Sequence, residues 1–251
     1  IPEGANAQLV DVTSPNAVLS LMGPRSREIL QSVTRADVSN AAFPFATAQR
    51  IGIAGAPVLA LRVTYVGELG WELHLPVEYA VAVYEALMAA GAAHGLRNAG
   101  YRAIETLRLE KGYRAWAGDI GPDFTPFEAG MGWAVKLRKN VDFKGRKALE
   151  AQKANGMKKL LACFTVDDPA VILLGRETIL RDGKPAGWLS SAGWGHTVGK
   201  NIGFGYVRNG GGVDADYVRA GRYELEVATE RVPCTVTLEP LYDPQMLRIK
   251  A

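Results

Sequence analysis

The sequence has few of the residues that build the commonest catalytic and metal sites. It contains two cysteines and three histidines in 251 residues, and Cys163 and Cys234 stand too far apart to form a metal-binding motif. Two thiols in a chain of this length are typical of a reducing compartment. None of the histidines stands in HExxH or HxH spacing, and the sequence has no GxSxG, Walker or CxxC motif. We therefore expect no metal site, and we interpret each histidine as a structural or surface residue.

Long apolar runs and a strong excess of either charge are also absent. No stretch of 18 apolar residues occurs, so we expect no membrane span. The 29 basic residues exceed the 26 acidic ones by three. That excess is too small to predict a nucleic-acid-binding protein, although it is compatible with an anionic small ligand. The first residue is Ile1 rather than Met, and no signal-peptide pattern follows it. We expect the chain to begin inside a longer sequence.

The first part of the chain mixes strands and helices. Apolar residues with a period of two predict strands at 8–13, 17–22, 50–53, 58–65 and 71–75. The helical period and the stop signals predict helices that begin near Pro24 and at 77–93, 99–111 and 144–155. Residues 113–143 form a loop-rich segment, and loops of this length more often serve a function than not. This alternation indicates an α+β fold.

The second part of the chain consists almost entirely of short strands. The best boundary lies at Asn155–Gly156, so we expect two domains, 1–155 and 156–251. Asp182–Gly183 is a strong signal for a tight hairpin. Six strands are predicted, at 160–166, 177–180, 185–190, 202–207, 222–227 and 232–238. This pattern is typical of a small β-barrel or sandwich.

One candidate site is the segment that runs from Tyr65 to Glu72 and reads Tyr-Val-Gly-Glu-Leu-Gly-Trp-Glu. Trp71 and Glu72 are neighbours on a predicted strand and therefore face opposite sides of the sheet. If Trp71 packs into the core, Glu72 faces outward. Its carboxylate can then accept two parallel hydrogen bonds from a planar amidine-like edge. A solvated strand glutamate has the same spacing, so both interpretations stay open at this point.

A second cluster of charges lies on the predicted helix and just after it. Arg102, Glu105, Arg108 and Lys111 recur every three residues, which places charge on one slowly drifting side of the helix. The simpler interpretation is a surface helix with ion pairs along it. Asp119 follows in a Gly-Asp pair, which is also a common turn.

Taken together, these segments resemble the folate-binding aminomethyltransferase family of the glycine-cleavage T-protein. The matching segments are Tyr65–Glu72, Glu105–Arg114, Gly118–Ile120 and Pro126–Gly130. Further segments are most similar to the dimethylglycine and sarcosine dehydrogenase branch, in which this domain follows an FAD-containing domain on the same chain. These are Trp133–Lys136, Gly187–Gly193, His196–Lys200 and Leu241–Pro244. The resemblance covers almost all of the chain.

The resemblance implies a fold, a cofactor and site residues. The fold would be part of a tetrahydrofolate-binding aminomethyltransferase domain followed by a small C-terminal β-barrel. Glu72 would pair with the amino-pyrimidinone edge of the pterin, and Tyr65 would line the folate pocket. In the T-protein an Arg meets the glutamate tail of folate, but here Ile104 occupies the matching position. Arg102, two residues earlier, is therefore our candidate for that contact.

The implied reaction is the capture of a one-carbon unit. Flavin oxidation of an N-methyl amine gives an iminium or formaldehyde, which tetrahydrofolate traps as 5,10-methylenetetrahydrofolate. Proximity supplies much of the rate. The family's base is an Asp far upstream of the pterin-binding Glu. Counting back by that distance from Glu72 leads to a position before Ile1, and Asp11 is much too close to Glu72 to be this base. We therefore expect no catalytic residue and no flavin domain in this chain, and no activity from it alone.

The resemblance also implies the partners and the location. The expected partners are folate and the one-carbon unit from the amine, with homo- or hetero-oligomers possible and with neither nucleic acid nor membrane. The expected location is a bacterial cytoplasm or a mitochondrial matrix. Two alternatives stay open. One is a separate subunit that completes its site with another chain. The other is a non-enzymatic module whose barrel binds single-stranded nucleic acid, although its aromatic residues have the spacing of a core.

Overall fold

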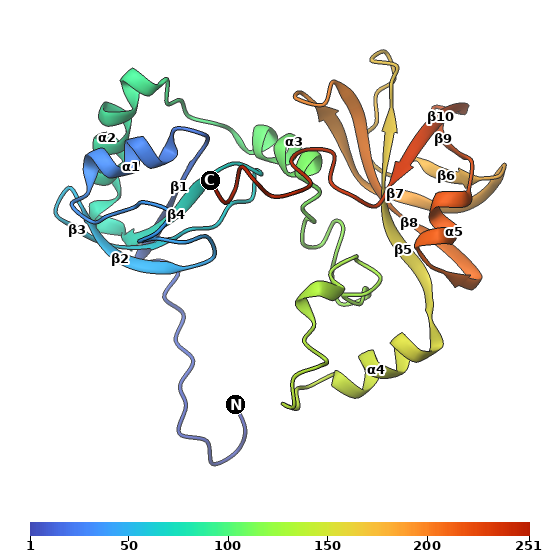
Figure 1. Cartoon of the computed structure of the whole chain (residues 1–251), viewed down its shortest axis with the longest axis horizontal. Helices are drawn as coiled ribbons and strands as arrows, with labels where there is room; N and C mark the ends of the chain where they lie inside the picture. The colour runs from blue at the N-terminus through green and yellow to red at the C-terminus, as the bar shows by residue number, and fades with distance from the viewer. The chain divides into compact units, whose positions relative to one another are not determined.

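A computed structural model describes residues 1–251 and divides them into two compact units. Unit 1 comprises residues 1–99 and 245–251, and unit 2 comprises residues 100–244. Figure 1 shows the elements of each unit along the chain. Compact units need not coincide with evolutionary domains, so the predicted domains 1–155 and 156–251 stay a prediction.

Unit 1 contains an antiparallel sheet of four strands in the order β1-β4-β3-β2. The strands are β1 (Asn16–Met22), β2 (Ala48–Ile53), β3 (Ala56–Leu61) and β4 (Gly70–Pro76). β2 and β3 pair as a hairpin. Its turn residues Ala54 and Gly55 both have positive φ, 49° and 80°, as a two-residue turn between twisted strands requires. β4 is paired on both edges, with β1 and with β3.

The helices of unit 1 cover one face of this sheet (Figure 1). They are α1 (Ser26–Val33) and α2 (Ala80–Gly91), and α2 is flanked by the short 3-10 helices η1 (Val77–Tyr79) and η2 (Ala92–His94). Trp71, Leu73 and Leu75 of β4 point into the core beneath them and are at most 1% exposed. Because side chains alternate along a strand, Glu72 and His74 lie on the other face.

The predicted strand at 8–13 does not form, so this prediction was wrong. Residues 8–12 are extended and exposed, and they belong to no strand. The apolar side chains of Leu9, Val10 and Val12 are between 57% and 90% exposed. The pattern of residue types was suited to a strand, but no strand of this chain pairs with the segment. An unpaired strand is not stable by itself, so the segment forms no strand.

Unit 2 begins with helix α3 (Tyr101–Lys111), whose end is fixed by the left-handed Gly112 at φ 76°. The loop-rich segment after it is confirmed, and it contains only the short η3 (Gly132–Ala134). Helix α4 (Arg146–Asn155) then leads into the strands. The predicted helices at 99–111 and 144–155 are therefore confirmed to within about two residues, the usual uncertainty of helix ends.

The remainder of unit 2 is a closed barrel of six strands in the order β10-β5-β8-β7-β6-β9. They are β5 (Met157–Val166), β6 (Thr178–Arg181), β7 (Lys184–Gly195), β8 (Lys200–Val213), β9 (Tyr223–Val227) and β10 (Glu230–Thr237). The predicted barrel is therefore confirmed, and closure leaves no free sheet edge. Helix α5 (Ala215–Ala220) was not predicted from the sequence; Asp214 caps it by accepting a hydrogen bond from the main-chain N–H of Tyr217. Separately, none of the helices has both the length and the apolar surface needed to cross a membrane.

Candidate functional site

The structure shows which way the Trp71–Glu72 pair faces, which the sequence left conditional. Trp71 is fully buried, and its ring meets Phe43 edge-on, with 6.1 Å between the ring centroids. The guanidinium groups of Arg27 and Arg62 lie 5.4 and 5.7 Å from the Trp71 centroid. Such contacts hold an aromatic side chain in one orientation. Glu72 therefore points away from the core, and 32% of its side chain is exposed.

The surroundings of Glu72 leave its carboxylate accessible. Its direct neighbours across the ladder are Ser20 on β1 and Leu61 on β3. The one side chain that bonds it is His74, two residues on along the same face, with 3.3 Å between Nε2 and Oε2. Oε1 makes no hydrogen bond within the chain. A planar ligand edge with two adjacent N–H donors matches this acceptor.

Tyr65 lies in the loop that joins β3 to β4, and it is partly exposed. The loop is fastened at its end, where the carbonyl of Leu69 accepts hydrogen bonds from the N–H of Gly23 at 2.8 Å and the hydroxyl of Ser26 at 3.0 Å. Tyr65 and Glu72 thus belong to one unit and to neighbouring segments. Arg102 lies exposed on the first turn of α3, in the other unit. A joint role for the three residues stays a prediction.

The charged residues of α3 do not form the surface helix that the sequence analysis favoured, so that interpretation was wrong. Arg108, Glu110 and Lys111 are each only 1% exposed. A buried charge is costly unless it is paired and hydrogen-bonded. Each of the three residues finds partners in a different later segment of the chain, and it is these distant partners that override the amphipathic pattern.

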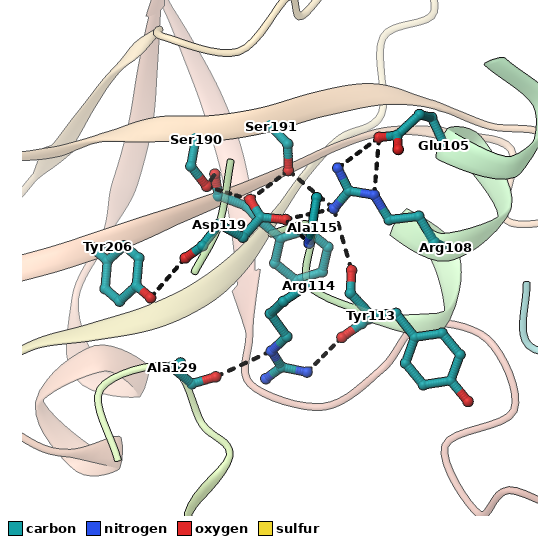
Figure 2. Close-up of polar contacts among 12 residues, drawn as sticks. Glu105, Arg108, Tyr113, Arg114, Ala115, Asp119, Ala129, Ser190, Ser191 and Tyr206 are labelled. Carbon is teal, nitrogen blue, oxygen red and sulfur yellow. Dashed lines mark hydrogen bonds and ion pairs between the residues drawn. The ribbon is translucent and has the colours of Figure 1, made fainter. Parts of the chain in front are cut away.

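Asp119 is the centre of the first set of partners (Figure 2). Its side chain is fully buried, and its Oδ2 accepts hydrogen bonds from Arg108 Nη1 at 2.6 Å and from the N–H of Ala115 at 2.9 Å. Its Oδ1 accepts bonds from the hydroxyls of Ser190 at 2.5 Å and Ser191 at 2.7 Å. Four donors, one of them the cation Arg108, satisfy this carboxylate, so Asp119 is more than a turn residue.

The polar network continues around the ion pair of Arg108 and Asp119 (Figure 2). Arg108 also donates to Glu105 Oε2, from Nε at 3.1 Å and from Nη2 at 2.8 Å. The hydroxyl of Tyr206 donates to the main-chain oxygen of Asp119 at 2.9 Å, and burial raises the pKa of that phenol. Arg114 Nε donates to the carbonyl of Ala129 at 3.1 Å, and burial lowers the pKa of its guanidinium.

Glu110 and Lys111 connect α3 to two further segments. Glu110 Oε1 accepts hydrogen bonds from the N–H groups of Thr197 at 2.6 Å and Val198 at 2.8 Å. Lys111 Nζ donates to the carbonyl of Asp243 at 2.6 Å and to its Oδ2 at 2.9 Å. Four of the segments that carried the resemblance, Gly118–Ile120, Gly187–Gly193, His196–Lys200 and Leu241–Pro244, therefore meet at α3. In this part of the molecule they form a satisfied structural network, which sequence spacing alone could not reveal.

The cavities of the structure lie elsewhere. A surface hollow of about 500 Å³ lies between the end of α1 and the β2–β3 turn, and residues 32–36, Gly52, Ala54 and Gly55 line it. A small pocket of about 20 Å³ lies beside Cys163 in unit 2. No group of three His, Cys, Asp or Glu side chains is arranged to hold a metal ion.

Comparison with known proteins places these features in a family. Residues 2–139 match the GCVT N-terminal domain, and residues 159–243 match the glycine cleavage T-protein C-terminal barrel domain. Sarcosine dehydrogenase of mouse mitochondria is 48% identical over 245 residues, which are 97% of this chain. Human mitochondrial dimethylglycine dehydrogenase is 37% identical over 95% of this chain. The chain spans only 27% of the length of each of these two relatives.

Shorter relatives agree with the same assignment. An aminomethyltransferase of Caldanaerobacter subterraneus is 34% identical over 90% of this chain and 58% of its own length. The crystal structure of the glycine cleavage system aminomethyltransferase T from Bartonella henselae superposes with a TM-score of 0.77 at 25% identity, covering 91% of this chain and 60% of that chain. The predicted α+β fold with its C-terminal barrel is confirmed, and the chain belongs to the glycine cleavage T-protein family.

Proposed function

We propose that this chain is the folate-dependent one-carbon-transfer region of a sarcosine or dimethylglycine dehydrogenase. The identities of 48% and 37% to two such dehydrogenases, over nearly the whole chain, support this assignment. The relatives extend well beyond the matched region, and we assign the flavin-dependent oxidation of the amine to that other part. The mitochondrial relatives and the two free thiols fit a mitochondrial matrix or a bacterial cytoplasm. Assembly into a homo- or hetero-oligomer belongs to the same proposal.

The observation that carries the proposal is the carboxylate of Glu72. Glu72 stands on a strand that is paired on both edges. The adjacent residue Trp71 faces the opposite side and is fully buried in the core. Oε1 of Glu72 makes no hydrogen bond within the chain. The amino-pyrimidinone edge of a pterin presents two adjacent N–H donors, and a carboxylate accepts such a pair in parallel. Glu72 would hold tetrahydrofolate by this edge. The bound folate would supply the nitrogen atoms that take up the one-carbon unit.

We assign folate contacts to two further residues, one in each unit. Tyr65, on the loop before β4, would line the pterin pocket. Arg102 would meet the negatively charged glutamate tail of folate. A guanidinium is suited to this role because its planar fork of donors matches a carboxylate. The amine-derived one-carbon unit would be captured while folate is held, so binding and orientation are the tasks of these side chains.

The direct test measures tetrahydrofolate binding by calorimetry under reducing conditions. We expect Glu72→Gln to weaken binding about 10- to 150-fold, because one charge-assisted contact is lost. Glu78→Gln is the matched control, since Glu78 is an exposed carboxylate of the same unit, and it should bind as the unchanged chain does. Failure of the unchanged chain to bind, or equal affinity of the Glu72→Gln protein, would overturn the proposal.

The role of Arg102 needs its own comparison. Tetrahydropteroate has the pterin but lacks the glutamate tail. Arg102→Gln should therefore weaken the binding of tetrahydrofolate and leave tetrahydropteroate unaffected. If both ligands lose affinity equally, or neither does, the tail contact is not made by Arg102.

A further inference from the structure

The outer face of the sheet in unit 1 contains an imidazole beside the carboxylate of Glu72. His74 follows Glu72 by two residues, so both side chains leave β4 on the same side. Nε2 of His74 lies 3.3 Å from Oε2 of Glu72, and 34% and 32% of the two side chains are exposed. The contact is thus accessible from solvent, and both members stand on the same strand.

The neighbouring strands offer Glu72 no other charged partner. On β1 the residues opposite Glu72 and His74 are Ser20 and Val18. On β3 they are Leu61 and Leu59. Arg50 on β2 pairs with Leu59 and therefore stands one strand farther away from His74. The hydrogen bond from His74 is consequently the one side-chain contact that fixes the carboxylate.

We propose that His74 is a positioning residue that holds the carboxylate of Glu72 ready for its ligand, an inference that rests on the proposed function. A free glutamate side chain has considerable rotamer freedom, which binding would have to remove. A donor on the same strand face removes part of that freedom beforehand. His74 does not block the site, because a carboxylate oxygen has two acceptor positions and Oε2 can accept from the imidazole and from a ligand together.

The contact between Nε2 of His74 and the carboxylate of Glu72 determines which ring nitrogen carries the hydrogen. An ionised carboxylate only accepts hydrogen bonds, so Nε2 of His74 carries the hydrogen in this contact. A long-range ¹⁵N–¹H correlation spectrum reports which ring nitrogen is protonated. We expect His74 to carry its hydrogen on Nε2 in the unliganded chain. A neutral ring protonated on Nδ1 alone would contradict the inference.

Binding measurements with two substitutions test the role. His74→Leu removes the donor, and we expect it to weaken tetrahydrofolate binding about 5- to 10-fold. His74→Gln keeps an N–H donor on a side chain of similar reach, and we expect it to restore affinity to within about 2-fold of the unchanged chain. In a Glu72→Gln background His74→Leu should have little further effect, since the carboxylate it positions is gone.

A second histidine of unit 1 serves as the control, and failure of the His74 role can be told apart from failure of the proposed function. His94 also stands beside a carboxylate in unit 1, with 3.1 Å to Glu28, and His94→Leu should leave folate binding unchanged. If Glu72→Gln weakens binding but His74→Leu does not, the role of His74 is overturned and the proposed function stands. Equal losses with Leu and Gln would also overturn positioning by a hydrogen bond. No binding by the unchanged chain would overturn the proposed function itself.

Discussion

The ammonium group of Lys111 lies 2.9 Å from Oδ2 of Asp243, a residue 132 positions later in the sequence. The two side chains are 0% and 7% exposed. Water therefore does little to screen this pair, and removing one partner takes the counter-charge away from the other buried charge. The contact fastens the end of α3 to the segment that follows the barrel.

Replacing Lys111 is expected to destabilise unit 2 strongly. Lys111→Met keeps most of the side-chain volume but removes the cation that pairs with the buried carboxylate of Asp243, so the free energy of unfolding should fall by about 3–5 kcal/mol. Urea denaturation followed by circular dichroism measures the change. Lys153→Met on the exposed side of α4 is the control and should change stability by less than about 0.5 kcal/mol. Similar curves for the two variants would contradict the buried pair.

Arg108 should be equally intolerant of substitution. Arg108→Met leaves the fully buried Asp119 without its cation, and we expect a loss of about 3–5 kcal/mol. Arg108→Lys retains the charge but cannot donate to Glu105 and Asp119 at once with the guanidinium geometry, so its loss should be intermediate. Thermal unfolding ranks the two variants against Arg138→Met, an exposed control. An unchanged melting temperature for Arg108→Met would show that the network does not contribute.

A single methyl group at Gly187 should disrupt the barrel. Gly187 has φ 157°, and a Cβ at this position would lie 2.0 Å from the main-chain oxygen of Tyr206 on the neighbouring strand. Gly187→Ala should therefore cost more than about 4 kcal/mol or abolish soluble expression. Gly210→Ala is a matched control on β8, because its Cβ would meet nothing within 4 Å. Equal melting temperatures for the two variants would refute the close approach.

The two thiols should be unreactive in the folded chain. Burial raises the pKa of Cys163 and of Cys234 from 9.0 to about 12, so at pH 8 only about one molecule in 10,000 would carry a given thiolate. Titration with a thiol-specific disulfide reagent at pH 8 should label neither residue until urea is added. One rapidly labelled equivalent in the native protein would contradict this.

The raised pKa values of Cys163 and Cys234 also predict how the free energy of unfolding changes at alkaline pH. In the folded chain the thiols keep protons that the unfolded chain releases above pH 9, so the folded state binds more protons between about pH 9 and 12. Their stabilising contribution is complete below pH 9 and decreases as the pH rises toward 12. Each thiol should lower the free energy of unfolding by up to about 1.4 kcal/mol per pH unit in that range. A Cys163→Ala, Cys234→Ala double variant should show a shallower decline.

Local rules predicted much of the fold. Gly112 ended α3 as expected, and Asp182 and Gly183 adopt φ 52° and 76° at the tip of the β6–β7 hairpin. These features depend on a few adjacent residues. The burial of Arg108 and Lys111 depends on partners 83 and 132 residues away, and spacing along a helix contains no information about such contacts. Residues 8–13 show the opposite case, in which a suitable pattern found no partner strand.

For the candidate site, too, the sequence predicted local features but not contacts between side chains. Alternation along the strand predicted that Trp71 and Glu72 face opposite sides, and the structure shows that Trp71 is the one that faces inward. The contact with His74 was not predicted, because the spacing of histidine motifs indicates metal sites and not a neighbour on the same strand face. Roles for Tyr65 and Arg102 depend on a bound ligand, so they stay predictions.

The double pairing of β4 limits how this site can change. Glu72 is matched with Ser20 on one side and Leu61 on the other. Moving the backbone at Glu72 would therefore require both ladders to open, because β4 is paired with a strand on each side. The loop that contains Tyr65 lacks such pairing over most of its length. Adaptation to a ligand of a different shape would therefore come from substitutions in that loop, while the position of the carboxylate stays constant.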